Sequence, residues 1–183
     1  MASLLLGVDI GTSSAKGVLC APDGAILAQA TIAHETSFPR PGWAEHDADA
    51  IWWGEFVAIT RELLGGRWSG ADVGAGAVSA IGPCMLPVDA AGRPLRPGVL
   101  YGIDSRAMVE IAWLEDRHGA GEMFARNGMA LTAQAVGPKI LWLRRHEPEV
   151  FAQATIIHSA SGYMVHRLTG EHVIDRHTAS YFV

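Results

Sequence analysis

Apolar residues open the chain in a run that ends at a charged residue and a polar turn. Leu4 to Val8 are apolar apart from Gly7, and Asp9, Ile10 and Gly11 follow before three hydroxyl residues. A continuous apolar run of this length predicts a strand buried on both faces. Apolar character returns at 16–20 and again at 25–34, so three strands joined by tight turns are expected at the start of the chain.

The rest of the pattern alternates between helical and strand-like spacing. Apolar residues recur at helical spacing after Asp47 and Asp49, either of which could cap that helix, and Gly65-Gly66 ends it. Asp104 or Ser105 is expected to cap a later helix that ends near Gly119. Helices are predicted over 51–64, 105–119, 121–127, 137–146, 147–153 and 161–168, and strands or extended segments over 74–81, 86–88, 99–103, 154–158 and 172–174. Three hairpin strands followed by mixed elements indicate an α/β fold, a mixed β-sheet flanked by helices.

Composition narrows the class of protein. The 183 residues are 49% hydrophobic and 18% charged with a net charge of −5, which predicts a globular domain, whole or part of a larger one. The basic residues are scattered along the sequence, which argues against a positively charged patch that binds nucleic acid or an anionic membrane. Cys20 and Cys84 lack disulfide or metal spacing, and the N-terminal apolar run is too short for a signal peptide or a membrane span. We therefore expect a cytoplasmic protein.

The first turn carries the candidate chemistry. A glycine such as Gly11 lets a backbone approach a ligand closely, and successive N–H groups form a concave site for phosphate oxygens. Thr12 and Ser13 add hydroxyl groups, Lys16 adds a positive charge, and Asp9 could hold a hydrated Mg²⁺. An ordinary hairpin turn with a polar tip would have the same residues, so this pattern alone leaves both interpretations open.

Longer motifs resemble a known family. The segment from Asp9 to Lys16 resembles the first phosphate-binding segment of the sugar-kinase, actin and Hsp70 superfamily, whose domains have a ribonuclease-H-like fold. Further segments are similar to the FGGY carbohydrate kinases, especially xylulokinase-like members, and they follow in the family's order. They are PGWAEHD at 41–47 with IWW at 51–53, DAAGRPLRP at 89–97, KILWL at 139–143 with EPEVF at 147–151, and HRLTGE at 166–171 with Asp175 and TAS at 178–180.

The resemblance implies ATP and Mg²⁺ as cofactors and a small-molecule sugar or polyol as substrate. Asp9 falls where the family orders the metal, and Gly11, Thr12 and Ser13 fall where it contacts the nucleotide phosphates. Lys16 falls where a basic residue commonly sits. These residues are the expected metal and phosphate sites.

The sugar site departs in part from the family pattern. Xylulokinases have a Gln-Met-His run that contacts the sugar, and this chain has Ile81, Gly82 and Pro83 there. Tyr101, Asp104 and Arg106 resemble the segment where the family places an aromatic residue and an Asp-x-Arg pair against polyol hydroxyls. A carboxylate acceptor beside a guanidinium donor suits vicinal hydroxyls. Gly82, Pro83, Tyr101, Asp104 and Arg106 are therefore the candidate substrate contacts.

The resemblance also implies that residues 1–183 form an N-terminal kinase domain that is incomplete at its C-terminus. The general-base Asp and a second, C-terminal domain with the adenine pocket are expected beyond Val183, so this chain alone should be inactive. A phosphatase or polyphosphate hydrolase of the same superfamily, or a non-catalytic sugar-binding or regulatory module, are the alternatives. The sequence leaves the sugar and the oligomeric state open, a homodimer included.

Histidine and tryptophan residues are assigned structural roles. The eight histidines are dispersed and show no zinc-type spacing, which favours surface or packing positions. Trp52, Trp53 and Trp142 share the period of their helices' apolar residues and are expected in the core. Trp43 fits a loop anchor and a cleft wall equally well.

Overall fold

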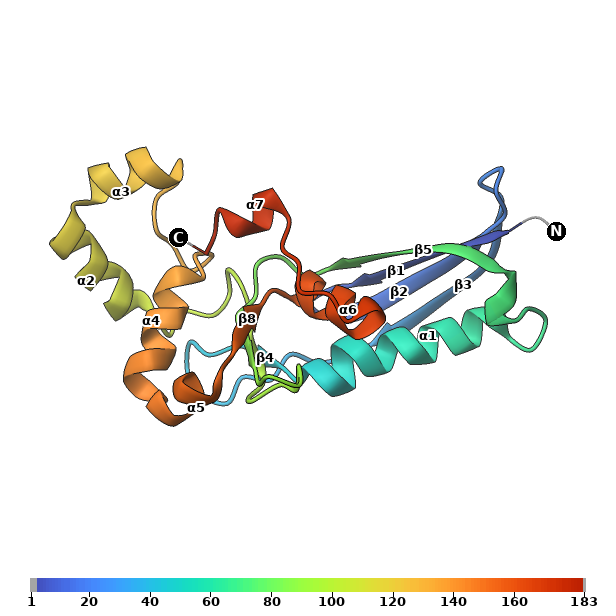
Figure 1. Cartoon of the computed structure of the whole chain (residues 1–183), viewed down its shortest axis with the longest axis horizontal. Coiled ribbons are helices and arrows are strands. Elements are labelled where there is room, and N and C mark those ends of the chain that lie inside the picture. Colours follow the sequence, from blue (N-terminus) through green and yellow to red (C-terminus); the bar gives the residue numbers. More distant parts are fainter. Residues whose placement is uncertain (1–2, 183) are drawn as a thin grey trace. The chain divides into compact units, whose positions relative to one another are not determined.

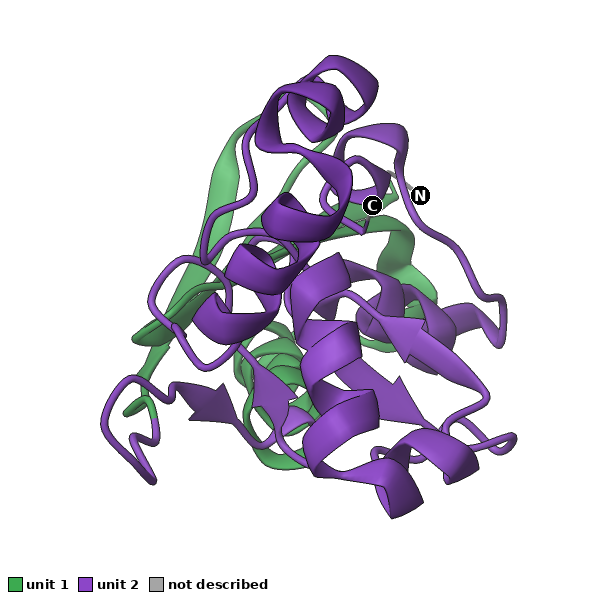
Figure 2. Ribbon diagram, turned by 90° about the vertical axis from the view of Figure 1, so that its left-hand side faces the viewer, with its two compact units in different colours: residues 1–36, 49–81 green, residues 37–48, 82–183 purple. Residues whose placement is uncertain are grey.

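The computed structural model describes residues 3–182. The chain divides into two compact units. Unit 1 comprises residues 1–36 and 49–81, and unit 2 comprises residues 37–48 and 82–183 (Figure 2). Among the described residues, no helix combines the length and the apolar character that crossing a bilayer requires.

Unit 1 is built on a four-stranded mixed sheet. Strands β1 (Leu4–Ile10), β2 (Ser14–Cys20), β3 (Ile26–Ala33) and β5 (Val73–Ala80) lie in the order β3-β2-β1-β5 (Figure 1). The first three strands pair antiparallel, and β5 pairs parallel with β1. Asp9 consequently lies beside Lys16 on one neighbouring strand and Ser79 on the other. The predicted hairpin strands and mixed sheet are confirmed.

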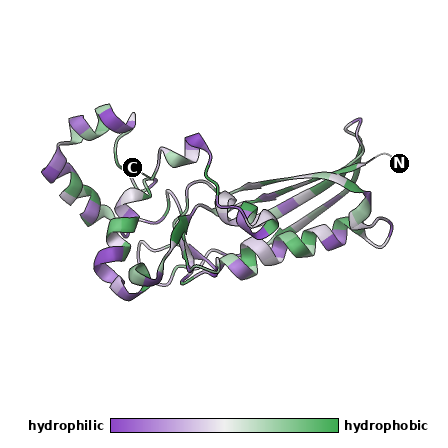
Figure 3. Cartoon of the chain, in the orientation of Figure 1, coloured by the Kyte–Doolittle hydropathy of each residue, from purple (hydrophilic) through white to green (hydrophobic). Residues whose placement is uncertain are grey.

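Helix α1 (Glu55–Leu64) lies along one face of this sheet (Figure 1). Ile59 and Leu63 are buried, whereas Arg61 and Glu62 are exposed. The colours along α1 in Figure 3 alternate accordingly between hydrophobic and hydrophilic. Gly65 ends the helix in the left-handed conformation, as predicted. The preceding turn is different from the expectation, because residues Ala48–Gly54 form a π-helical segment, η1, instead of regular α-helix.

The prediction that β1 is buried on both faces is wrong. Its residues alternate between buried and exposed, and Leu5 is 41% exposed. Leu4, Leu6, Val8 and Ile10 form the buried set. The continuous apolar run predicted that both faces of β1 would be covered. In this chain only one face is covered, and the other stays accessible.

Gly17 sets how closely α1 approaches the sheet. A Cβ built at Gly17 would lie 2.3 Å from Ile59 Cγ2 and 2.9 Å from Leu63 Cδ1. We expect Gly17→Ala to lower the free energy of unfolding by about 1–3 kcal/mol through overpacking, measured by urea denaturation. Gly76→Ala is the matched control on β5, where the new Cβ would meet only Leu6 O at 3.8 Å. Equal free energies of unfolding in the two variants would contradict the close packing of α1 against Gly17.

Unit 2 surrounds short strands with helices. Strand β4 (Glu45–His46) pairs with β7 (Gly98–Val99), and β6 (Leu86–Val88) pairs with β8 (Ile156–His158). The helices are α2 (Met108–His118), α3 (Ala120–Asn127), α4 (Gly137–His146), α5 (Pro148–Gln153), α6 (Ala160–Thr169) and α7 (Arg176–Ala179). One core cluster joins Met85, Val99, Ala107, Val136, Trp142 and Leu143. The predicted helices over 121–127, 137–146, 147–153 and 161–168 are confirmed within two residues.

Several local features of unit 2 differ from the predictions. Helix α2 begins at Met108 and has no side-chain cap, because the carboxylate of Asp104 is occupied by Arg106 and by the amide of Ala44. Residues 172–174 are not a strand, and β8 pairs only with β6 among the described residues. Asp175 instead caps α7, which no periodicity had indicated, through its Oδ1 and the amide of Thr178.

Candidate functional site

The turn between β1 and β2 is closed by its own backbone. The amide of Gly11 donates to Ser14 O at 2.9 Å, and a Cβ on Gly11 would lie 3.0 Å from that same oxygen. Ser13 O accepts from the amide of His34, and Thr12 O accepts from the hydroxyl of Thr36. These bonds fix the carbonyls and leave the amides of Thr12 and Ser13 with no acceptor among residues 3–182.

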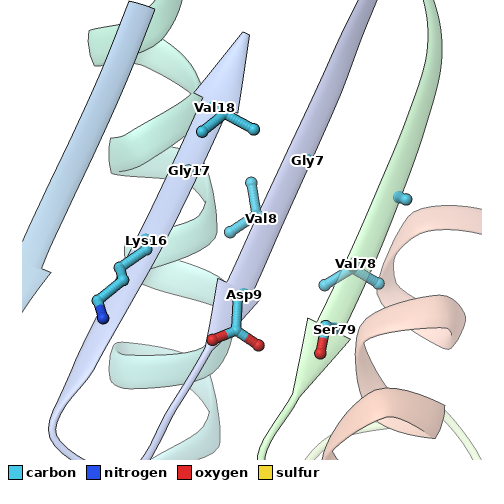
Figure 4. A pocket seen from close by; sticks show the side chains of 9 residues that line it. Gly7, Val8, Asp9, Lys16, Gly17, Val18, Val78 and Ser79 are labelled. Carbon is cyan, nitrogen blue, oxygen red and sulfur yellow. The ribbon is translucent and has the colours of Figure 1, made fainter. Parts of the chain in front are cut away.

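Charged and hydroxyl side chains lie next to this turn, on one side of the sheet. Asp9, Lys16 and Ser79 line an open hollow of about 350 Å³ together with Gly7, Val8, Gly17, Val18, Ala77 and Val78 (Figure 4). Figure 4 also shows α1 behind the strands, on the far side from the carboxylate and ammonium groups. Although Asp9 and Lys16 are cross-strand partners, no ion pair joins them among the described residues. Both charged groups are exposed and available to a ligand.

This arrangement fits a phosphate group and its metal ion. Two unpaired neighbouring amides and an ammonium group are donors for phosphate oxygens. An exposed carboxylate is an oxygen ligand of the kind that Mg²⁺ uses, directly or through its water. The amide of Gly11 is not available as a donor to phosphate, in contrast to the expectation, because it closes the turn by bonding to Ser14 O. The structure brings the predicted phosphate and metal residues together in unit 1, and their binding roles stay predictions.

Unit 2 buries the predicted substrate pair, Asp104 and Arg106. Asp104 is fully buried, and its Oδ2 accepts from Ala44 N at 2.7 Å and from Arg106 Nη2 at 2.7 Å. Arg106 also pairs with Glu45 at 2.8 Å. The carboxylate of Asp104 is thus saturated by its own chain, while Arg106 Nη1 is a buried donor without a described partner.

Two tryptophans enclose the Arg106 guanidinium. Its Cζ lies 4.0 Å from the ring centre of Trp43 and 5.0 Å from that of Trp142, and the two rings meet edge to face at 5.2 Å. Arg96 extends the charge network by bonding both Glu45 and Glu147. Trp43 therefore anchors its loop to the core of unit 2. Trp52 and Trp142 are buried as predicted, whereas Trp53 is only partly buried.

The remaining substrate candidates lie beside one another. A Cβ on Gly82 would be 2.9 Å from Cε1 and Cζ of Tyr101, so the glycine lies against the face of that ring. Tyr101 is partly exposed, whereas Pro83 is buried. Substrate contact by these residues remains a prediction.

Lys139 holds the loop that carries Tyr101 and Asp104. Its Nζ donates to Leu100 O at 2.8 Å and to Ala133 O at 2.7 Å, and the residue is 1% exposed. Burial lowers the pKa of Lys139 to about 8, with Asp104 opposing that shift. The resemblance to the family includes Lys139 in the segment 139–143 but implies no such role for it. Its distant carbonyl partners give no signal in the sequence.

Cys84 lies in the same part of unit 2 and is buried. Burial raises the pKa of its thiol to about 12, so the thiolate is negligible at neutral pH. This supports the role of a small core residue.

Comparison with known proteins agrees with this architecture. The model of the FGGY family of carbohydrate kinases, N-terminal domain, matches residues 4–182. Xylulose kinase of Escherichia coli (strain K12) is 33% identical over 177 residues, covering 97% of this chain and 36% of that protein. Glycerol kinase of Nocardia farcinica is 28% identical over 185 residues, covering 98% of this chain and 37% of that protein.

A solved structure supports the same assignment. The crystal structure of xylulose kinase from Rhodospirillum rubrum superposes with a TM-score of 0.89 at 32% identity, covering 98% of this chain and 36% of that one. The fold is thus the ribonuclease-H-like α/β fold of the actin, Hsp70 and sugar-kinase superfamily, as expected. The chain spans little more than a third of the length of these relatives. The chain belongs to the FGGY family of carbohydrate kinases and corresponds to its N-terminal domain.

Proposed function

We propose that the protein containing this chain is an ATP-dependent carbohydrate kinase that phosphorylates a hydroxyl of a sugar or polyol. The observation that carries the proposal is the β1–β2 turn, where unpaired amides lie beside the free charged groups of Asp9 and Lys16. Membership of the family and the similarity to xylulose and glycerol kinases support the same reaction.

The residues of unit 1 would bind and orient the nucleotide phosphates. The amides of Thr12 and Ser13 would donate to phosphate oxygens, and Lys16 would meet the negative charge that spreads over the transferring group. Asp9 would hold hydrated Mg²⁺, which supplies charge neutralisation at the phosphates when bound. Because hydrogen bonds within the chain already hold the turn in shape, little reorganisation would be needed during transfer.

The residues of unit 2 would position the acceptor. Tyr101 offers an aromatic surface, and Arg106 Nη1 is a donor aimed at no other described group. The buried Asp104 would act by fixing that guanidinium. We propose that the general base and the adenine pocket come from a C-terminal domain, and that domain closure excludes water from the reaction.

An acceptor screen tests this function. The full-length protein is incubated with Mg²⁺ and ATP against pentuloses, polyols and sugar acids, and ADP and inorganic phosphate are measured separately. We expect ADP release that depends on one acceptor class, and no turnover by the 183-residue chain. Phosphate release without any acceptor would instead indicate a phosphatase, and a sugar-dependent thermal shift without turnover would indicate a binding module.

Gly82 provides a test of the sugar site. Gly82→Ala would push its methyl group against the Tyr101 ring, and small displacements of positioning groups reduce turnover strongly, by up to about 10²-fold. We expect KM for the acceptor to rise at least about 10-fold while KM for ATP is unchanged. Gly121→Ala on α3 is the control, since nothing lies within 4 Å of its new Cβ. An unchanged KM for the acceptor in Gly82→Ala would contradict the proposal that Tyr101 contacts the acceptor.

A further inference from the structure

Three histidines of unit 2 gather outside the proposed kinase site. One ring nitrogen from each of His158, His166 and His172 lies within 4.8 Å of the other two. The His166 and His172 rings stack at a centroid distance of 4.2 Å, and His158 Nε2 lies 3.0 Å from His172 Nδ1. The residues are 8 and 6 positions apart in the sequence, so the fold and not a local motif assembles them.

Each histidine is placed by a different element. His158 is buried at the end of β8, opposite Leu86 of β6. His166 lies on α6, whose first turn Ser159 caps through the amide of Gly162. Gly170 ends α6 with a φ of 80°, which reverses the chain and returns His172 to the other two rings.

His166 has a polar atom that the chain itself does not satisfy. Its Nδ1 is buried and has no described hydrogen-bond partner. Its Nε2 is at the turn around Gly92, where a Cβ would lie 2.1 Å away, so only glycine fits. A buried polar atom without a partner destabilises a fold, and native structures rarely contain one without a ligand or water.

We propose that His158, His166 and His172 bind a divalent transition-metal ion, Zn²⁺ being the expected one. Imidazole nitrogen is a preferred zinc ligand, and three histidines with one open position make a common zinc coordination. The ion would join β8, α6 and the segment after Gly170 in unit 2. This site is independent of the proposed kinase reaction.

The geometry requires only a local adjustment. Tetrahedral Zn²⁺ with Zn–N distances of about 2.0–2.1 Å needs its ligand atoms about 3.4 Å apart. The His158–His172 contact is already inside this limit, and the exposed His172 lies in an irregular segment that can turn its ring.

An adjacent hollow leaves room for a fourth ligand. About 320 Å³ of open space is lined by His158 and His172 together with Ser159, Val173, Ile174 and Phe182, among others. Water, or a small anion, could therefore reach the ion from this side. The open position makes the site reachable for an ion added to the folded protein.

Metal titration of the untagged full-length protein tests the proposal. Metal-free protein is titrated with Co²⁺, whose visible absorption reports nitrogen ligation, and Zn²⁺ is then added as competitor. We expect one equivalent of Co²⁺, displacement by Zn²⁺, and a rise in Tm with Zn²⁺. His172→Gln removes an exposed ligand without opening the core, and should weaken binding at least about 100-fold. His118→Gln, outside the cluster, should bind like the parent.

A second variant separates metal binding from folding. His166→Leu replaces the unsatisfied ring with an apolar side chain, so it should keep or raise the Tm of the metal-free protein while abolishing the visible Co²⁺ signal. The proposal is overturned if no stoichiometric Co²⁺ binding occurs. It is equally overturned if His172→Gln binds as tightly as the parent.

Discussion

Replacing Asp9 with Ala in the full-length protein is expected to lower kcat for sugar phosphorylation by about 10²–10³-fold, the usual loss when a preorganised electrostatic contact to a transferring group is removed. The proposed Mg²⁺ ligand would be gone, and nothing else in the hollow offers a carboxylate. The side chain of Asp9 is exposed and makes no hydrogen bond or ion pair within residues 3–182, so the free energy of unfolding should change by less than about 0.5 kcal/mol.

The matched control for Asp9 is Glu62→Gln on α1, which removes an exposed carboxylate of the same unit away from the turn. Its kcat should equal that of the parent enzyme. Steady-state kinetics at saturating ATP and acceptor, with Tm measured on the same samples, distinguish lost chemistry from lost folding. Near-parental turnover by Asp9→Ala would refute the metal role of Asp9.

Replacing Arg106 with Leu is expected to have the largest effect on stability. Arg106 neutralises the buried carboxylates of Asp104 and Glu45, and its guanidinium lies between the rings of Trp43 and Trp142. Removing one partner of a buried ion pair leaves the other charge uncompensated, at a cost of about 3–5 kcal/mol. The loop at 37–48 should loosen with it, because Asp104 holds the amide of Ala44.

Urea denaturation followed by tryptophan fluorescence measures this loss. Arg126→Leu is the control, since Arg126 forms an exposed ion pair with Glu122 four residues earlier in the same unit, worth about 0.3–0.5 kcal/mol. A loss below about 1 kcal/mol in Arg106→Leu would contradict the account of the buried network. In the same variant, the affinity for the acceptor should fall more than the affinity for the nucleotide.

Local sequence patterns predicted most helices and strands. The predictions that failed concern burial and side-chain partners, which depend on tertiary contacts. The turn residues between β1 and β2 and the glycine that ends α1 follow from short-range chemistry. The one-sided burial of β1 could not be predicted, because an apolar strand has the same sequence pattern whether one face or both faces are covered. Likewise Asp104 resembles a helix cap in the sequence, but its partners Ala44 and Arg106 take its oxygens in the fold.

The two halves of the candidate site differ in predictability. Asp9, Thr12, Ser13 and Lys16 lie within eight residues, so a motif contains the whole phosphate site. The network around Arg106 joins Glu45, Arg96 and Glu147, which are separated by about fifty residues each. Charge pairs at that separation leave no periodic signal. The same holds for His158, His166 and His172, whose spacing in the sequence predicted surface or packing positions.

The most direct test of the central claim is a crystal structure of the full-length protein with Mg²⁺ and a non-hydrolysable ATP analogue. The account predicts phosphate oxygens within hydrogen-bond distance of the Thr12 and Ser13 amides, with Lys16 on the phosphates and the hydrated ion held by Asp9. Nucleotide bound elsewhere, with the β1–β2 turn empty, would contradict it.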